Sequence, residues 1–401
     1  MLKGKKIALG VAGGIAIFKV ADLTSKLVQA GAEVRVVMTE AATKLITPIT
    51  FKELSGNFVA TDMWTGNQEF NVEHIALAQW ADALLIAPAT ANIIGKIAHG
   101  IADDMLSTVA IACRKPIIVC PAMNTGMYEN PVVQGNIAAL EQRGMIIMPP
   151  KAGHLACGTS GAGRLPEALE IRAFVDNFFA QQDGDLKGLK FLVTAAGTRE
   201  AIDPVRFIGN RSSGKMGYAI TQDILARGGQ VVLVSGPSAL TPPLGAEFVS
   251  VESTEQMLEA VLKYYAGVDV VIKAAAVADY KPHEVATQKI KKQATDDFTL
   301  KLDKNPDILK ILGEKKTHQF LVGFAAETQH LLENAQAKLQ KKNLDMIVAN
   351  DVTAAGAGFN ADTNIVKFLY PDGIVEEVPK MSKDAVGMAL LDVVRSKLKD
   401  F

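Results

Sequence analysis

The feature that most constrains the fold of this sequence is a repeated alternation of short, β-branched apolar runs with helical patterns. In the first half the apolar runs lie at residues 7–11, 33–39, 83–89 and 116–122. Runs of this kind are typical of buried parallel strands. Between the first two runs, a helical face is predicted by the spacing of Ala16, Val20, Leu23 and Leu27, before the stop at Ala30 and Gly31. Together these segments predict a β-α-β unit.

A second series of the same kind follows a polar, glycine-containing stretch at residues 181–185, which we interpret as a linker. Its apolar runs lie at residues 191–197, 230–236, 268–279, 320–326 and 345–350. The two series are not repeats of each other, so the chain reads as a fusion of two different α/β domains. We expect two doubly wound, Rossmann-like domains at residues 1–182 and 188–401, which fits a length of 401 residues.

Charge and cysteine content exclude several classes of protein. The 42 Lys+Arg balance 43 Asp+Glu, which leaves no global charge for binding nucleic acid or an anionic membrane. No segment is long and apolar enough for a membrane span, and Lys19 and Asp22 interrupt the N-terminal apolar run, which argues against a signal peptide. Three cysteines without CxxC spacing fit a reducing compartment. We therefore expect a cytoplasmic protein that acts on small molecules.

Glycine and amide residues gather where the strands of the first half end. The turn at residues 10–14 contains Gly10, Gly13 and Gly14, and it lies between a strand and a helix. A tight turn without a ligand would also use such glycines. Two further strand ends carry short side chains followed by Asn92 and Asn124, and ligands bind at this edge of open α/β sheets. The pattern favours a ligand site.

Two other segments of the first half contain candidate reactive groups. His74 falls in the first turn of a helix that Asn71 can cap, where a neutral imidazole is favoured and can act as a base or hydrogen-bonding partner. A histidine with only a structural role is the alternative. The glycine-rich segment 153–164 reads as a flexible flap that carries Cys157 and Arg164. His154 and Cys157 have no second pair, so a metal site is not expected there.

The motifs GVAGGIA, ATAN, PAMNTGMY and LACGTSGAGR, together with His74, resemble the flavin-dependent phosphopantothenoylcysteine decarboxylase family over about the first 180 residues. The resemblance implies a flavodoxin-like flavoprotein domain, bound FMN and oxidative decarboxylation of a C-terminal cysteine. His74 would be the base, Asn124 would bind the carboxylate that is lost, and Cys157 would donate a proton. FMN contacts are implied for Gly13, Gly14, Thr39, Ala89, Thr90, Asn92, Ser107 and Met123. Ala12 and Tyr128 depart from the family's commoner Ser or Thr and Trp.

In the second half, residues 209–216 nearly match a P-loop. Met216 stands where a Ser or Thr would hold magnesium, and the required strand does not precede the loop, so we reject that interpretation. The serines and glycine of the loop can still bind a phosphate through backbone donors. The lysine groups at residues 289–292 and 338–342 are, as isolated features, most often solvated charge. Asp279 ends a nearly uncharged strand, where a carboxylate is expected to meet a metal or a ribose.

Residues 188–401 resemble the phosphopantothenate-cysteine ligase domain, through AAGTREAIDPVRFIGNRSSGKMG, KAAAVADY, KIKK, GFAAET and KKNLDMIVAN. The whole chain thus resembles the bacterial bifunctional proteins of coenzyme A biosynthesis. That family activates the phosphopantothenate carboxylate with CTP and Mg²⁺ as an acyl-cytidylate, which cysteine converts to the amide as CMP leaves. Nucleotide contacts are implied for Asp279, Lys289, Asn305, Pro306, Asp307, Ile308, Phe324, Lys338 and Lys342.

Further roles follow from the same resemblance. Asp279 would also hold the metal, Lys289 would be catalytic, and Asn210 would be needed for turnover of the acyl intermediate. The family implies homo-oligomers, with trimer-based flavin domains and dimeric ligase domains. The sequence departs from the family's commoner residues at Ala196, Ala201, Gly209 and Arg211.

Two other classes of function were weighed. A nicotinamide-dependent oxidoreductase would also use doubly wound domains, but the sequence lacks GxGxxG and the acidic residue that follows it. A flavin- or nucleotide-binding regulator without catalysis is the second alternative. A flavin spectrum would exclude the first, and product formation would exclude the second.

Overall fold

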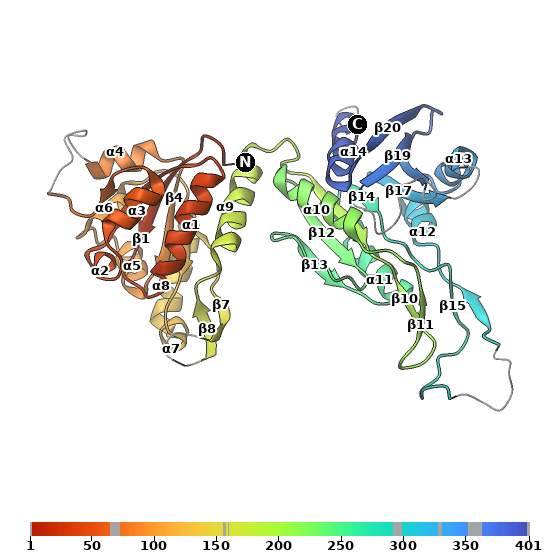
Figure 1. Ribbon diagram of the computed structural model, residues 1–401, viewed down its shortest axis with the longest axis horizontal. Coiled ribbons are helices and arrows are strands. Elements are labelled where there is room, and N and C mark those ends of the chain that lie inside the picture. The colour runs from red at the N-terminus through yellow and green to blue at the C-terminus, as the bar shows by residue number, and fades with distance from the viewer. Residues whose placement is uncertain are drawn as a thin grey trace. The chain divides into compact units, whose positions relative to one another are not determined.

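The computed structural model describes residues 2–64, 73–154, 158, 160–291, 299–327, 331–351 and 363–398. The chain divides into two compact units, Met1–Asp176 and Asn177–Phe401 (Figure 1). The division falls inside helix α9 (Ala168–Asp183), so residues 181–183 of the expected linker are helical. Within the described ranges, no helix combines the length and apolar character needed to cross a membrane.

In the described part of the first unit, six parallel strands form the main sheet in the order β3-β2-β1-β4-β5-β6. Their bounds are β1 (Lys6–Val11), β2 (Glu33–Met38), β3 (Val59–Ala60), β4 (Ala83–Ala89), β5 (Ile117–Pro121) and β6 (Ile146–Ile147). This is the Rossmann order, and without the two-residue β3 it is the flavodoxin order. The expected doubly wound, flavodoxin-like class is confirmed. The order reverses between β1 and β4, which makes their carboxyl ends the place for a ligand.

The helices of the first unit are α1 (Ile17–Gln29), α2 (Glu40–Thr43), α3 (Pro48–Ser55), α4 (Glu73–Trp80), α5 (Ala91–Ala98), α6 (Met105–Ala112), α7 (Thr125–Tyr128) and α8 (Pro131–Gln142). Helix α1 buries Val20, Leu23 and Leu27 as predicted, but Ala16 is its N-cap and Ile17 takes the fourth buried position. Amphipathic spacing therefore identified the helix and missed its first residue.

The predicted irregular flap contains regular structure. Strands β7 (Lys151–His154) and β8 (Ser160–Arg164) form an antiparallel hairpin, so the expectation of a loop through these residues was wrong. Glycine is needed here for close packing. At Gly163, where φ is +122°, a Cβ atom would lie 2.3 Å from the backbone oxygen of Met123. Glycine at this position therefore indicates that β8 packs closely against the backbone of Met123, and does not indicate an irregular loop.

The described residues of the second unit form a larger sheet in the order β13-β12-β9-β14-β17-β18-β19-β20. Its strands are β9 (Lys190–Ala195), β12 (Gln230–Ser235), β13 (Glu247–Ser250), β14 (Val270–Lys273), β17 (Phe320–Glu327), β18 (Met346–Asp351), β19 (Thr363–Leu369) and β20 (Val375–Ser382). The strands from β13 to β18 are parallel and again have the Rossmann order. The antiparallel β19 and β20, which the sequence did not predict, extend this sheet.

Strand β14 is shorter than the predicted strand 268–279 because the chain leaves the ladder after Lys273. The amide of Ala275 donates to Thr194 Oγ1 (3.2 Å), and the amide of Ala278 donates to Thr198 Oγ1 (2.9 Å). Thr194 lies in β9 and Thr198 lies in the turn after it. Their hydroxyl oxygens accept the hydrogen bonds that backbone carbonyl oxygens of a neighbouring strand would accept in a regular sheet. The apolar run continues as a turn at the sheet edge.

Strand β20 is the last strand of its sheet and is irregular. Val378 pairs with Val366 and Met381 pairs with Asn364, so β20 contains one more residue than β19 between these pairs. This is a β-bulge, and Pro379 lies within it.

Helices cover both faces of the second sheet: α10 (Lys215–Ala226) and α14 (Lys383–Lys397) on one, and α11 (Thr254–Tyr265), α12 (Ile308–Lys315) and α13 (Leu331–Lys341) on the other. Two small ribbons pair β10 (Arg199–Ala201) with β11 (Phe207–Gly209), and β15 (Tyr280–Pro282) with β16 (Leu302–Lys304). Helix α10 approaches β9 closely, because a Cβ atom on Gly217 would lie 2.6 Å from that of Ala195.

Candidate active sites

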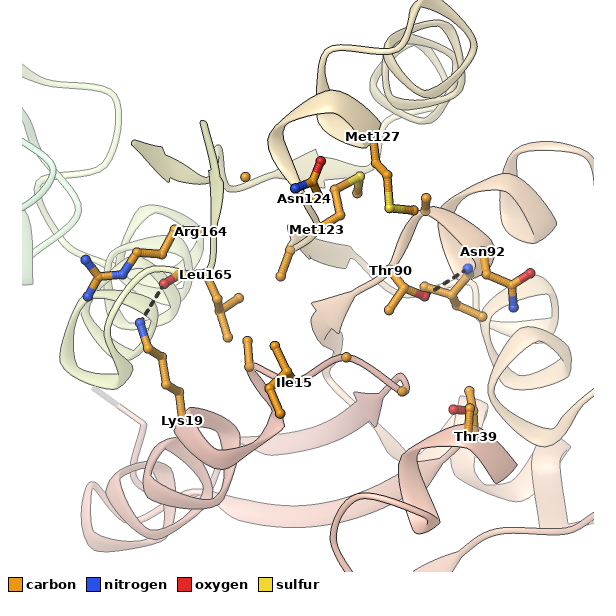
Figure 2. A pocket seen from close by; sticks show the side chains of 18 of the residues that line it. Ile15, Lys19, Thr39, Thr90, Asn92, Met123, Asn124, Met127, Arg164 and Leu165 are labelled. Atoms are coloured by element: carbon orange, nitrogen blue, oxygen red, sulfur yellow. Dashed lines mark hydrogen bonds between the residues drawn. The ribbon is translucent and has the colours of Figure 1, made fainter. Parts of the chain in front are cut away.

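A cavity of about 1090 Å³ opens at the carboxyl ends of β1, β4 and β5 in the first unit (Figure 2). Its volume is at the upper end of the range for cofactor sites, roughly 300–1,000 Å³. The lining includes the turn Gly13–Gly14, the start of α1, and residues 163–165 of the β7–β8 hairpin and the segment after it. The cavity therefore lies at the strand ends, where the glycine and amide residues predicted a ligand site.

Several of the lining residues are N-caps of helices, among them Thr39, Thr90 and Asn124. Thr39 Oγ1 accepts from Ala42 N (3.3 Å), and Thr90 Oγ1 accepts from Ile93 N (3.4 Å). Asn124 Oδ1 accepts from Gly126 N (2.9 Å), which makes its Nδ2 the atom suited to donate to a carboxylate. The starts of α2, α5 and α7 thus border one cavity, and helix N-termini favour negative charge nearby.

A largely buried lysine joins α1 to the segment that follows β8. Lys19 Nζ donates to Leu165 O (3.0 Å, dashed in Figure 2) and to Glu167 Oε1 (2.8 Å), and its side chain is 12% exposed. Hydrogen bonds from Lys19 and then from Arg164 hold the pKa of Glu167 below its ordinary value. The pair closes one side of the cavity with fixed charges.

Not every residue predicted for the first site lines the cavity. Gly13, Gly14, Thr39, Thr90, Asn92, Met123 and Asn124 do. Ala89 and Ser107 are fully buried outside it, and His74 lies half-buried in the first turn of α4, also outside the described lining. Cys157 lies outside the described residues. Four further lining residues were not predicted from the motifs: Ile15, Phe18, Lys19 and Lys96. Of these, only Lys19 is marked in the sequence, as a charge within an apolar run.

In the second unit, hydrogen bonds join several residues that the resemblance had placed around a nucleotide. Asn210 Nδ2 donates to Val277 O (3.1 Å). Asn305 Nδ2 donates to Ala278 O (2.9 Å), and Asn305 N donates to Asp279 O (2.9 Å). The loop after β11, the turn after β14 and the segment before α12 therefore meet at one edge of the sheet.

Asp307 adds the start of α12 to this group. Its Oδ1 caps the helix by accepting from Lys310 N (3.1 Å), and its Oδ2 lies 2.8 Å from Lys342 Nζ. Burial raises the pKa of Asp307, but the bonds from Lys342 and Lys310 hold it below its ordinary value. We call Asn210, Asp279, Asn305, Asp307 and Lys342 the strand-end cluster.

Lys273, at the end of β14, is a candidate that sequence reasoning missed. Its ammonium group donates to Ala275 O (3.4 Å), and within the described residues it has no ion-pair partner. Burial and then the charge of Lys342 lower the pKa of Lys273 to about 8, against the carboxylate of Asp307. The only indication in the sequence was that Lys273 is a single charged residue within an apolar run. A half-buried cation of this kind favours binding of an anion.

The cluster also contains an unused acceptor. Asn305 Oδ1 is buried and has no hydrogen-bond partner in the described part of the chain, so a ligand donor fits there. Around the same edge, Pro306 precedes Asp307, Ile308 is buried at the start of α12, Phe324 lies half-buried in β17 and Lys338 lies in α13.

The remaining predicted residue, Lys289, stands apart from the cluster. It is exposed, and its ammonium group has no hydrogen-bond or ion-pair partner among the residues that the structure describes. The described residues contain no group of three or more His, Cys, Asp or Glu side chains arranged to hold a metal. A magnesium site at Asp279 would thus depend on phosphate oxygens for its other ligands.

The first doubly wound unit contains a cofactor-sized cavity, and the second contains a charged cluster at its strand ends. Together they define an enzyme with two separate active sites. Residues 1–180 match the family described as Flavoprotein, and residues 186–398 match the DNA/pantothenate metabolism flavoprotein C-terminal domain. The coenzyme A biosynthesis bifunctional protein CoaBC of Bacillus subtilis (strain 168) is 50% identical over 401 residues, which cover 100% of this chain and 98% of that protein. CoaBC of Escherichia coli (strain K12) is 43% identical over 396 residues, covering 98% and 97%.

The chain belongs to the family of coenzyme A biosynthesis bifunctional proteins. It is a bifunctional enzyme with decarboxylase and ligase activities, and its first half is a flavoprotein. The resemblance drawn from its motifs is confirmed.

Proposed function

We propose that this enzyme converts 4'-phosphopantothenate to 4'-phosphopantetheine in two steps. The second unit ligates 4'-phosphopantothenate to L-cysteine with CTP and Mg²⁺ through an acyl-cytidylate. The first unit, with FMN, then decarboxylates the resulting 4'-phosphopantothenoylcysteine. The observation that carries the proposal is the cavity at the β1–β4 switch point, bordered by Asn124 and by the hairpin whose connecting segment contains Cys157.

The residues around this cavity fit a flavin and a carboxylate. Gly14 leaves the turn after β1 open, since a Cβ atom there would meet only ordinary contacts at 3.4 Å or more. Lys19 and Arg164 supply positive charge beside the cavity, and the N-termini of three helices border it. When bound, FMN supplies two-electron oxidation and reduction, which the side chains alone do not provide.

The chain's own residues would bind the substrate and move its protons. Asn124 Nδ2 would hold the carboxylate until carbon dioxide leaves, and His74 would act as the base. Oxidation of the cysteine to a thioaldehyde makes that loss possible, because the electrons of the broken C–C bond pass to an enethiolate. Cys157 would then supply the proton that accompanies return of hydride.

In the second unit the proposal assigns charge neutralisation to the strand-end cluster. Lys342, with Lys338 and Lys273 nearby, would bind the triphosphate, and Asp279 would hold Mg²⁺. Lys289 would stabilise charge as diphosphate leaves the activated carboxylate. Asn210 offers a neutral amide that orients the acyl carbonyl while cysteine attacks it and CMP departs.

The proposal also includes cytoplasmic location and assembly into homo-oligomers. Large apolar side chains are exposed at the cavity, with Ile15 at 64% and Phe18 at 62%, which fits burial of this surface by another subunit. Sedimentation of the purified enzyme tests the assembly. A monomer at micromolar concentration would contradict it.

One experiment tests both steps. The purified enzyme is incubated with 4'-phosphopantothenate, cysteine, CTP and Mg²⁺ while diphosphate and carbon dioxide are measured, and the flavin is identified after release. We expect both products in equal amounts and release of FMN. Diphosphate without carbon dioxide would contradict the decarboxylase step, and neither product would contradict the whole proposal.

Two variants then test the assigned roles. Cys157→Ala should still release carbon dioxide but accumulate the oxidised enethiol, and ordinary phosphopantetheine at the wild-type rate would contradict the assignment. Asn210→Asp should accumulate acyl-cytidylate, because a second negative charge beside the intermediate hinders its reaction with cysteine. Lys289→Gln should accumulate none, because its residual rate of formation is far below that of the wild type. The reverse pattern would show that these two roles are exchanged.

A further inference from the structure

A buried carboxylate links the β10–β11 ribbon to the segment that carries Lys289. The side chain of Asp203, in the turn between β10 and β11, is 0% exposed. Its Oδ1 accepts from the amides of Val205 and Arg206, both at 2.8 Å. Its Oδ2 accepts from Arg206 Nε (3.0 Å) and from the amide of Ile290 (3.1 Å). Asp203 thus binds its own turn and a residue 87 positions away.

The same turn binds the other backbone group of Ile290. Arg206 Nη2 donates to Ile290 O (2.5 Å), so the N–H and C=O of that residue are both bonded to the turn. A third bond lies nearby, because Ala286 N donates to Ile202 O (3.0 Å). Figure 1 shows β10, β11 and β15 extending from the main sheet of the second unit. The segment 286–290 has few other means of support, since it forms no helix or strand.

The hydrogen bonds keep Asp203 ionised. Burial alone raises the pKa of this carboxyl, but donation from the amides of Val205, Ile290 and Arg206, and from the Arg206 side chain, lowers it to about 2. An amide would lack the second acceptor oxygen that these donors share, and protonation would turn one carboxyl oxygen into a donor. The contact to Ile290 therefore depends on an intact carboxylate.

We propose that Asp203 is a positioning residue of the ligase reaction, which fixes the backbone next to Lys289 and so determines where the Lys289 ammonium group meets the substrate. The proposal rests on the proposed role of Lys289. Lys289 is exposed, and four flexible side-chain bonds separate its charge from the backbone, so the backbone is what the protein can fix. Because charge stabilisation is sensitive to displacements of about 1 Å, loss of this anchor is expected to slow the step by roughly 10²-fold.

The first test compares Asp203→Asn with Asp303→Asn. Asp303 is a half-exposed carboxylate in β16 that binds His283 (2.8 Å), whereas the described hydrogen bonds of Ile290 go to Asp203 and Arg206. We expect acyl-cytidylate formation to fall about 10²-fold in Asp203→Asn, with the KM for cysteine unchanged, and to stay at the wild-type rate in Asp303→Asn. Equal rates in the wild type and Asp203→Asn would overturn the proposal.

A double-mutant cycle separates positioning from a general structural role. In the Lys289→Gln background, Asp203→Asn should reduce the rate by no more than about twofold, because the group that it positions is already absent. Multiplying losses would show that Asp203 acts independently of Lys289 and would overturn the proposal. Arg206→Lys provides a second variant if Asp203→Asn does not fold. It removes the fork that reaches Ile290 O, and we expect the same lack of additivity.

Hydrogen exchange keeps this inference separate from the proposed function. The amide of Ile290 should exchange slowly in the wild-type protein and at least tenfold faster in Asp203→Asn. If the wild-type enzyme forms no acyl-cytidylate, the proposed function is contradicted. The exchange rate of the Ile290 amide still decides whether Asp203 anchors this backbone. Unchanged exchange in Asp203→Asn would overturn the anchor itself.

Discussion

Replacing Gly217 with alanine should destabilise the second unit, although alanine is the better helix former. Gly217 lies in the first turn of α10, against β9. A Cβ atom there would lie 2.6 Å from Ala195 Cβ and 3.1 Å from both Ala195 Cα and Thr194 O. Two of these three atoms belong to the backbone of a central strand, so the helix must move. Because the turn before α10 contains Gly214 and follows Asn210, the movement reaches the strand-end cluster.

The magnitude follows from two opposing effects. Overpacking of a tight core contact costs about 1–3 kcal/mol. Replacing glycine by alanine inside a helix stabilises it by about 1 kcal/mol. The net effect is a loss of about 1–2 kcal/mol, because 2.6 Å is far below an ordinary carbon–carbon contact. For a unit of this size the melting temperature should fall by roughly 2–8 °C.

Gly387→Ala is the matched control in the same unit. Gly387 lies in α14, and a Cβ atom there would meet only atoms of Ile220 at 3.6–3.7 Å, which is ordinary contact. The helix gain should then dominate, and stability should rise by about 0.5–1 kcal/mol. The two substitutions are chemically identical and are expected to have opposite signs.

Differential scanning calorimetry of the whole chain measures both effects, with ligase and decarboxylase rates measured in parallel. Gly217→Ala should lower the ligase rate and leave decarboxylation of supplied phosphopantothenoylcysteine unchanged. A Gly217→Ala protein as stable as the wild type would refute the close approach of α10 to β9. A destabilised Gly387→Ala protein would refute the use of Cβ distances to predict the sign.

Three further predictions concern the two sites. The ammonium group of Lys273 attracts an anion only when it is protonated, so the affinity for inorganic triphosphate with Mg²⁺ should fall as the pH rises above about 8. Calorimetric titration should show this pH dependence in the wild type and not in Lys273→Met. Lys19→Met should weaken flavin binding about tenfold in a fluorescence titration, because it removes bonds worth about 1–2 kcal/mol, whereas Lys26→Met on the exposed side of α1 should not. Ser107→Ala should cost the first unit about 1 kcal/mol by thermal unfolding, since its hydroxyl completes a capping box with Asp104. Flavin affinity should not change in this variant, and weaker binding would restore Ser107 as a cofactor contact.

The sequence was most informative where structure depends on neighbouring residues. Buried parallel strands and the face of α1 follow from local patterns of apolar residues, and the doubly wound class of both domains follows from the alternation of strands with helices. The β7–β8 hairpin was missed, because two of the glycines that suggested a flexible flap pack against residues from another part of the chain: Gly163 against Met123 and Gly161 against Thr125.

Functional residues were likewise predictable only where their position depends on neighbouring residues in the sequence. Thr90 and Asn124 were found because they follow strands directly, and strand ends are where ligands bind. Asp203 carried no local signal of its role, since Ile290 is 87 residues away. Lys273 resembles any charge that ends a strand until folding places it beside Lys342 and Asp307.

The bulge in β20 has a consequence for how the enzyme behaves at high concentration. A terminal strand exposes a row of backbone donors and acceptors, and another chain can add to such a row. Here Pro379 lacks a donor, the extra residue breaks the spacing, and Glu376, Glu377 and Lys380 add charge to the same strand. A regular, uncharged strand in this place would offer a template for intermolecular pairing. The irregularity of β20 therefore protects the enzyme against sheet-to-sheet aggregation.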